Sequence, residues 1–179
     1  MQTEKDLFEA IKQQDQKALE QLYHLYFPRL SRFIAQVMQD SNDVVDVINE
    51  VFLVVWNDAE KFRGDSSLSS WIMGIAYNKV LSTARKKKHW LSFSDDLSGF
   101  EAINDNMIQA EPSSDIEDVR KVMKSLSPEQ RAMTELTYFF GYSYQEVSEI
   151  LKCKTSFVRH QLYEARQLIK QRMETGNNS

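Results

Sequence analysis

The sequence has few residues that could build a catalytic, metal or redox site. Of its 179 residues one is a cysteine, Cys153, so an internal disulfide is excluded, and its apolar surroundings predict a small buried side chain. The three histidines do not cluster with carboxylates or cysteine at ligand spacings, so we expect no metal. No glycine-rich phosphate loop, nucleophile elbow or paired catalytic carboxylates can be recognised. The sequence therefore predicts neither an enzyme nor a bound cofactor.

Long apolar segments are also missing. No run of eighteen apolar residues occurs, and residues 1–6 lack the basic and then apolar pattern of a signal peptide. We therefore expect no membrane insertion and a cytoplasmic location. An apolar content of 42% with 11% aromatic residues is ample for packed cores.

The chain has no excess of positive charge, because its formal net charge is −4. The charge is, however, distributed unevenly. Residues 1–90 hold twelve cations and twelve anions, residues 91–118 hold no cation and eight anions, and residues 119–179 hold ten cations and six anions. The acidity therefore lies in the middle of the chain. The C-terminal part keeps a local basic surface that can approach phosphates.

The last fifty residues have the pattern of a helix-turn-helix. Ser143 and Glu146 predict a capping box that opens a short helix, a turn follows at residues 152–154, and Thr155 is suited to cap the next helix. In that last helix the apolar residues recur every three or four positions, which leaves four polar side chains to face outward: Arg159, His160, Tyr163 and Arg166. Such a helix suits the major groove of duplex DNA.

The periodicity of the remaining sequence is helical and predicts an all-α fold of two small domains. Residues 1–90 predict an N-terminal helical bundle, in which Asp15 and Ser41 are suited to cap helices and residues 44–56 form an apolar stripe broad enough for burial on two sides. Residues 91–117, rich in Ser, Asp, Asn and Gly, predict a flexible acidic linker. Residues 118–175 predict about four helices, with a capping box at Ser127 and Gln130 and a left-handed cap at Gly141.

Residues 62–88 combine a polar loop with a helix that carries aromatic residues and ends in four consecutive cations. Aromatic rings can stack on bases, an asparagine can pair with a base edge, and cations can follow a backbone, so this mixture fits single-stranded nucleic acid. The alternative is that Phe62 and Trp71 belong to the core and that the cations form a solvated helix end.

These segments together resemble the extracytoplasmic-function (ECF) sigma factors, the compact promoter-recognition subunits of bacterial RNA polymerase. Residues 43–56 (DVVDVINEVFLVVW) resemble the polymerase-docking helix of that family, residues 62–78 its −10 reader, and residues 126–147 the start of its −35 reader. The similarity covers both halves of the chain in the family's order.

The resemblance implies a role for each segment. It implies contact with the clamp and flap regions of the polymerase, with the clamp bound through the strip Asp46, Asn49 and Glu50. It implies capture of the unpaired −10 strand by Phe62, Arg63, Gly64, Asp65, Ser66, Ser67, Trp71, Tyr77, Asn78, Arg85 and Lys86. It implies contact with the −35 duplex by Lys154, Thr155, Ser156, Phe157, Arg159, His160, Tyr163 and Arg166. An anti-sigma factor is the implied regulator.

The sequence also departs from the family pattern. Val44 and Val45 replace small and acidic residues, Ser82 replaces a frequent aspartate, and Lys152 stands at a usual turn glycine. Ser156 and Phe157 replace a usual Gly-Thr pair, and Gln161 and Glu164 stand where arginine is frequent. Because a carboxylate near phosphate lowers affinity, we expect altered −35 contacts. The alternative function is a free-standing helix-turn-helix regulator that binds duplex DNA without polymerase.

Overall fold

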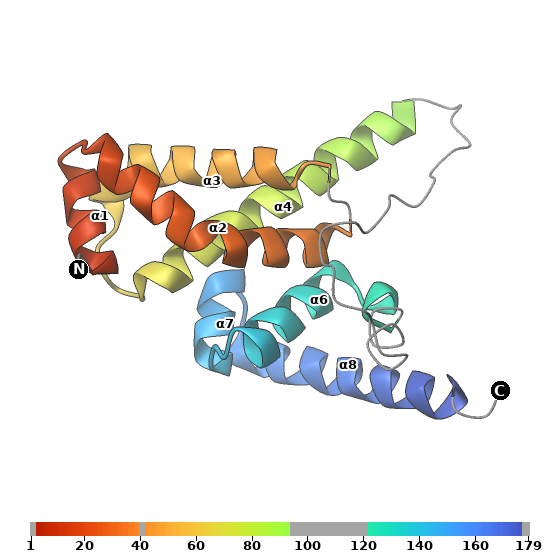
Figure 1. Cartoon of the computed structure of the whole chain (residues 1–179). Helices are drawn as coiled ribbons and strands as arrows, with labels where there is room; N and C mark the ends of the chain where they lie inside the picture. The colour runs from red at the N-terminus through yellow and green to blue at the C-terminus, as the bar shows by residue number, and fades with distance from the viewer. Residues whose placement is uncertain (1–2, 40–41, 94–121, 177–179) are drawn as a thin grey trace.

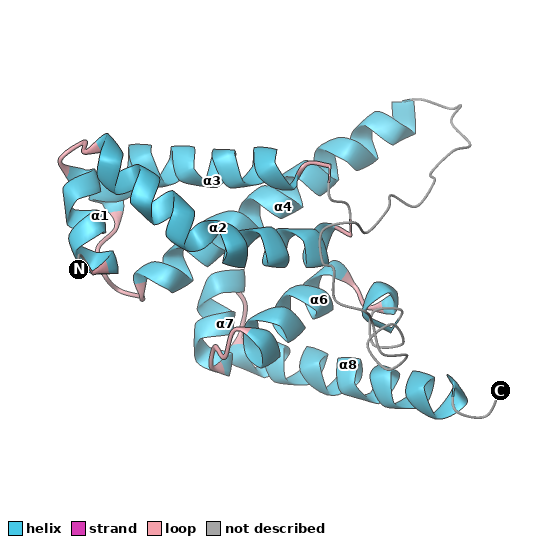
Figure 2. Ribbon diagram, in the orientation of Figure 1, coloured by secondary structure: helices cyan, strands magenta, loops and turns pink. Residues whose placement is uncertain are grey.

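Helices are the only regular elements in the part of the chain that the structure describes (Figure 2). This computed structural model describes residues 3–39, 42–93 and 122–176. The N-terminal half consists of α1 (Glu4–Lys12), α2 (Gln16–Met38), α3 (Val44–Asp58), the 3-10 turn η1 (Ala59–Lys61) and α4 (Leu68–Phe93). The C-terminal half begins with a helical turn at residues 122–125 and continues with α6 (Pro128–Thr134), the π-helical turn η2 (Glu135–Phe139), α7 (Tyr144–Leu151) and α8 (Thr155–Gly176).

The predicted all-α fold class is confirmed. Helix α4 continues to Phe93 and so includes the first three residues of the predicted linker, and the rest of that predicted linker lies outside the described residues. None of the described helices is long and apolar enough to cross a membrane.

Local capping explains where several helices begin. The Asp15 carboxylate accepts the backbone N–H groups of Lys17 and Ala18, at 2.8 and 3.2 Å. Capping boxes open two helices of the C-terminal half, with Ser127 and Gln130 at α6 and with Ser143 and Glu146 at α7. These start signals were predicted from the sequence and are confirmed. Gly141 has the predicted left-handed conformation, with φ of 74°.

Two predicted caps differ from the structure. Ser41 lies outside the described residues, and α3 begins at Val44, after Asp43. Thr155 is the first residue of α8 and directs its hydroxyl to α7, where it donates to Gln145 Oε1 at 3.1 Å or Ser148 Oγ at 3.2 Å. A threonine hydroxyl can satisfy its own helix or a neighbouring one, and here the neighbouring helix provides the partners.

The two halves share one hydrophobic core. Buried residues of α1 to α4 form a continuous cluster with residues of α6, η2, α7 and α8. Helix α6 packs on α2 and α7 packs on α4 (Figure 1). A smaller cluster joins Met123 and Leu126 to Ala165 of α8. The C-terminal half is therefore attached to the N-terminal half by packing as well as by the chain.

Candidate nucleic-acid interface

The first candidate surface is the loop before α4 together with the beginning of that helix. Gly64 has φ of 78° in open space, a conformation that glycine adopts at little cost. Arg63 and Asp65 form an exposed ion pair at 3.4 Å. Ser67 caps α4, because its Oγ accepts the backbone N–H of Ser70 at 3.0 Å. The loop thus presents polar groups to solvent while its end is fixed to the helix.

The aromatic residues of this surface are partly used by the core. The Phe62 and Trp71 rings lie 5.1 Å apart, and both contact Phe8 of α1, at 5.3 and 5.6 Å between ring centres. Neither Phe62 nor Trp71 is fully buried. Each ring therefore packs against the core on one side and keeps some exposed area, so the core interpretation holds in part and base stacking stays a prediction.

The remaining predicted −10 residues divide between surface and core. Asn78, Arg85 and Lys86 are exposed on α4. Tyr77 is 5% exposed, and burial raises the pKa of its hydroxyl to about 12. Tyr77 therefore packs in the core in this arrangement, whereas Asn78 is available to a base edge.

The second candidate surface is the outer face of α3. Asp46, Asn49 and Glu50 are exposed there, with Asn49 accepting from the Tyr23 hydroxyl at 3.2 Å and Glu50 paired with Lys79 at 3.2 Å. The helical period also places Val45 and Leu53 on this face, where they are 50% and 60% exposed.

These two exposures correct the prediction that the α3 stripe is buried on two sides. The stripe is buried on one side, and its outer apolar residues stand beside the acidic strip. An exposed apolar group rimmed by charge is typical of a protein-binding surface.

The third candidate surface is the helix-turn-helix formed by α7 and α8. Val158, Leu162 and Ala165 are buried against the core, as the spacing predicts. Most of the predicted −35 residues are exposed: Lys154, Ser156, Phe157, Arg159, His160, Tyr163 and Arg166, whereas Thr155 is partly buried by its contacts with α7. In the turn, Lys152 adopts φ of 53°, a left-handed conformation that favours glycine at the end of a helix.

Glu164 is occupied by neighbours on its own helix. It pairs with His160 at 3.3 Å and accepts a hydrogen bond from the Gln161 side chain at 3.3 Å. The carboxylate and the adjacent histidine thus partly neutralise one another when His160 is protonated. The most basic part of this face is consequently the side that carries Arg159 and Arg166.

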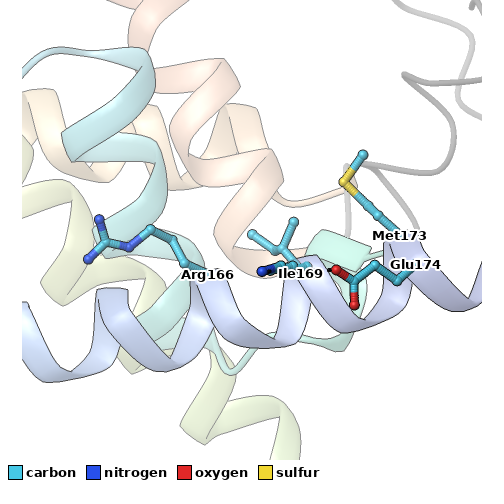
Figure 3. A pocket seen from close by; sticks show the side chains of 5 residues that line it. Arg166, Ile169, Met173 and Glu174 are labelled. Carbon is cyan, nitrogen blue, oxygen red and sulfur yellow. Dashed lines mark ion pairs between the residues drawn. The ribbon is translucent and has the colours of Figure 1, made fainter.

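Arg166 stands at the border of this face. Its Nε donates to the Leu162 carbonyl oxygen at 3.3 Å, and its guanidinium opposes the rise that burial produces in the pKa of the Tyr138 hydroxyl. Figure 3 shows a shallow apolar groove along α8, whose lining includes Arg166, Ile169 and Met173. Arg166 therefore lies between the outward face of α8 and this groove.

The structure brings the first surface and the helix-turn-helix together. A crevice of about 160 Å³ is bounded on one side by residues before and within α4 and on the other by the end of α7: Ser66, Ser70, Trp71, Gly74, Ile75, Asn78, Glu149, Ile150 and Lys152. A Cβ at Gly74 would lie 3.5 Å from the carbonyl oxygen of Ile150. This contact could not be predicted from the sequence, because it joins segments that are distant along the chain.

Comparison with known proteins identifies the family. Residues 22–89 match the family model for sigma-70 region 2, and residues 116–169 match that for sigma-70 region 4. The chain is 26% identical to the ECF RNA polymerase sigma-E factors of Escherichia coli K12 and Salmonella typhimurium LT2, in both cases over 96% of this chain and 95% of the relative. The protein is an ECF sigma factor.

Solved structures share the fold of this sigma factor. Sigma factor RpoE from Bartonella quintana, solved with the anti-sigma factor NepR, matches 88% of the chain with a TM-score of 0.75 at 23% identity and is itself covered to 98%. CnrH, solved with the cytosolic domain of CnrY, matches 94% of the chain with a TM-score of 0.67 at 18% identity and is itself covered to 96%.

Proposed function

We propose that this sigma factor directs core RNA polymerase to its promoters by two DNA contacts made in one complex. Helix α8 binds the −35 duplex, and the loop before α4 together with α4 captures the unpaired −10 strand. The carrying observation is that the region 2 and region 4 matches fall, in that order, on the two halves that carry these exposed polar surfaces. The protein acts without catalytic activity of its own.

The proposed −10 surface combines groups that recognise unpaired bases. The exposed Asn78 amide can pair with a base edge, the open faces of Phe62 and Trp71 can stack, and the exposed cations Arg85 and Lys86 can follow the backbone. The loop residues Arg63 to Ser67 offer further polar groups, and the open Gly64 lets a strand approach closely.

The proposed −35 surface is the first half of α8. Arg159 and Tyr163 lie one helical turn apart and are both exposed, so they can reach base edges from the major groove. Lys154 and Ser156 stand at the beginning of the helix, where side chains and backbone N–H groups suit phosphates, and His160 lies on the outward face beside Arg159.

The proposed polymerase contact is the outer face of α3. The polar and charged groups of this face come from Asp46, Asn49 and Glu50. Its exposed apolar area comes from Val45 and Leu53. This combination gives both specificity and buried area to a protein interface. We assign this face to the clamp of the polymerase.

An anti-sigma factor is the regulator that we propose. Support comes from the similar fold of RpoE, which was solved with the anti-sigma factor NepR. We place the function in the cytoplasm, where the polymerase acts.

The direct test is runoff transcription with purified core polymerase and a library of promoter fragments. The sigma factor should yield promoter-specific transcripts that core polymerase alone does not produce. Absence of specific transcripts, together with tight sequence-specific binding of duplex DNA by the chain alone, would instead support a free-standing regulator.

A further inference from the structure

The carboxylate of Glu164 is held on α8 by two neighbouring side chains. Its Oε1 lies 3.3 Å from Nε2 of His160, one turn before it, and its Oε2 accepts a hydrogen bond from the Gln161 amide at 3.3 Å. Both carboxylate oxygens therefore have a partner, while 48% of the side chain stays exposed. Each oxygen keeps a further lone pair that can accept a hydrogen bond from another molecule.

The helical period places this carboxylate on the outward side of α8. The buried side of the helix is formed by Val158, Leu162 and Ala165. His160, Tyr163 and Glu164 lie on the opposite side, where all three are exposed. Arg159 lies at one edge of this outward face and Glu164 toward the other. The two residues are about 7.5 Å apart along the helix axis, so they can address different base pairs of one duplex.

The cations of the same face allow a carboxylate to come close to DNA. Arg159 and Arg166 are exposed along the edge away from Glu164, and the exposed Lys154 directly precedes the helix. These three residues attract phosphates, whereas the carboxylate repels them. Glu164 therefore lowers the affinity of α8 for the duplex without preventing its approach.

A carboxylate can meet only certain base edges in the major groove. Cytosine presents there an amino group that donates, whereas guanine and thymine present acceptor oxygens. Because a carboxylate carries only acceptors, it bonds to cytosine and is repelled by guanine and thymine. Adenine presents an amino donor beside an acceptor nitrogen, so the carboxylate satisfies only half of that edge.

We propose that Glu164 is a specificity-determining residue that selects cytosine at one −35 position, with its carboxylate oriented by Gln161 and His160. This inference rests on the −35 assignment of α8 made above and adds the base that this edge of the helix accepts. The residue exchanges part of the affinity for DNA for discrimination between promoters. A carboxylate that acted only on phosphates would instead lower affinity for every sequence alike.

Selection from a duplex DNA library randomised through the −35 element tests this inference without requiring transcription. The library is offered in parallel to the holoenzyme assembled with core polymerase and to the full sigma chain alone at low salt, and the bound DNA is sequenced. We expect the parent protein to enrich cytosine about tenfold over guanine at one position, which corresponds to one good contact with a base edge.

Three substitutions of Glu164 should each change that position in a different way. Glu164→Gln supplies a donor as well as an acceptor, so the preferred base should change from cytosine to adenine. Glu164→Arg should change it to guanine, and Glu164→Ala should remove the preference. All three remove the negative charge, so each should also bind the whole library severalfold more tightly.

The orienting role of Gln161 has its own signature. Gln161→Met removes the amide donor and keeps a side chain of similar length. Enrichment of cytosine should therefore fall severalfold at the one position, while cytosine stays the preferred base and the midpoint of thermal unfolding stays the same. A lower midpoint with weaker enrichment at every position would mean that Gln161 serves the stability of α8 instead.

Glu174 provides the matched control. It is an exposed glutamate on the same helix and lies 4.0 Å from Lys170, four residues before it, just as Glu164 lies beside His160. It stands about 15 Å further along α8, away from the turn of the helix-turn-helix. Glu174→Gln should leave base preference unchanged throughout the −35 element.

The outcomes separate this inference from the proposed function. An unchanged base preference in Glu164→Gln, with or without tighter binding of the whole library, would overturn it even if runoff transcription gives promoter-specific products. A parent protein without preference for cytosine in either selection would overturn it as well. A change from cytosine to adenine in either selection would establish it even if no promoter-specific transcript forms.

Discussion

The carbonyl oxygen of Val37 and the guanidinium of Arg131 form a two-pronged hydrogen bond between residues 94 positions apart. Val37 lies in the last turn of α2, where carbonyl groups have no partner within their own helix. The third donor, Nη1, bonds to the Leu126 carbonyl oxygen at 2.6 Å. Arg131 therefore satisfies the end of one helix while it fixes the start of the C-terminal half.

Replacing this arginine should destabilise the whole chain. Arg131→Met keeps most of the side-chain volume but leaves two buried carbonyl groups without donors, at a cost of about 1–3 kcal/mol. Unfolding in guanidinium chloride should show a correspondingly lower midpoint. Lys124→Met, an exposed change nearby, is the control, and an equal midpoint for both variants would contradict the role given to Arg131.

The turn of the helix-turn-helix offers a stabilising change. Lys152 has φ of 53°, a conformation that carries a steric penalty for a residue with a Cβ. Lys152→Gly should therefore raise the free energy of unfolding by about 0.5–1 kcal/mol, after allowing for the greater freedom of glycine in the unfolded chain. Lys152→Ala keeps the Cβ and should bring no such gain. Equal stability of the two variants would contradict the steric penalty assigned to the left-handed backbone at this position.

Local signals explain how much of the fold could be predicted from the sequence. The capping boxes at Ser127 and Ser143 and the spacing of Val158, Leu162 and Ala165 depend on neighbours within a few positions, and the structure confirms them. The polar contacts between the two halves were not predicted, because arginine and glutamate, the residue types of Arg131, Arg32 and Glu135, usually lie at the surface. Only the fold shows that two of the three are buried.

The candidate sites were predicted less completely for the same reason. An apolar residue does not show by its type whether a neighbour covers it. From the sequence we predicted that Val45 and Leu53 are buried and that Tyr77 faces the single-stranded DNA. The structure exposes the two aliphatic residues and buries the tyrosine. The helical period tells which side chains share a face of the helix, whereas the packing of neighbouring elements decides which face is exposed to solvent.

The acidic strip of α3 should be required for holoenzyme assembly. Asp46→Lys with Glu50→Lys reverses two exposed charges one turn apart, and the second change also sets a lysine against Lys79. Assembly with core polymerase, followed by size-exclusion chromatography, should be lost. Glu60→Lys in η1 provides an exposed charge reversal outside this strip and should assemble normally. Normal assembly of the double variant would assign the strip to another role.

The buried Glu135 should make stability depend on pH in a specific direction. Burial raises the pKa of its carboxyl above the ordinary value of 4.5, and the lowering effect of Arg32 only partly offsets this. The folded chain thus binds the proton more tightly than the unfolded chain does. The stability that this group contributes is fully present below pH 4.5 and is lost as pH rises through the raised pKa.

The isosteric change Glu135→Gln isolates this effect. The difference in free energy of unfolding, parent minus variant, should fall as the pH rises above 4.5, because only the parent must then ionise a buried group. Chemical unfolding at a series of pH values measures the difference, and contributions of other groups cancel. A difference that grows with pH would mean that the ion pair with Arg32 outweighs the burial of the carboxyl.

Base preference should separate the two DNA surfaces. Arg159 is exposed on the outward face of α8, where a bidentate contact with guanine is worth about 1–3 kcal/mol of discrimination. Arg159→Ala should relax preference at one or two −35 positions and leave −10 preference intact, whereas Asn78→Ala should do the reverse. Lys154→Ala, which removes a proposed phosphate contact, should weaken all promoters alike.

Sequencing of runoff transcripts from a promoter library randomised at both elements measures these preferences in one experiment. The parent holoenzyme supplies the reference, and Lys154→Ala serves as the control for a loss of affinity without a change of specificity. Because Glu164 pairs with His160 on the opposite flank of α8, the Arg159 side is the part of this face best able to approach the duplex. A −10 shift upon changing Arg159, or no shift at all, would show that α8 reads the −35 element through other residues.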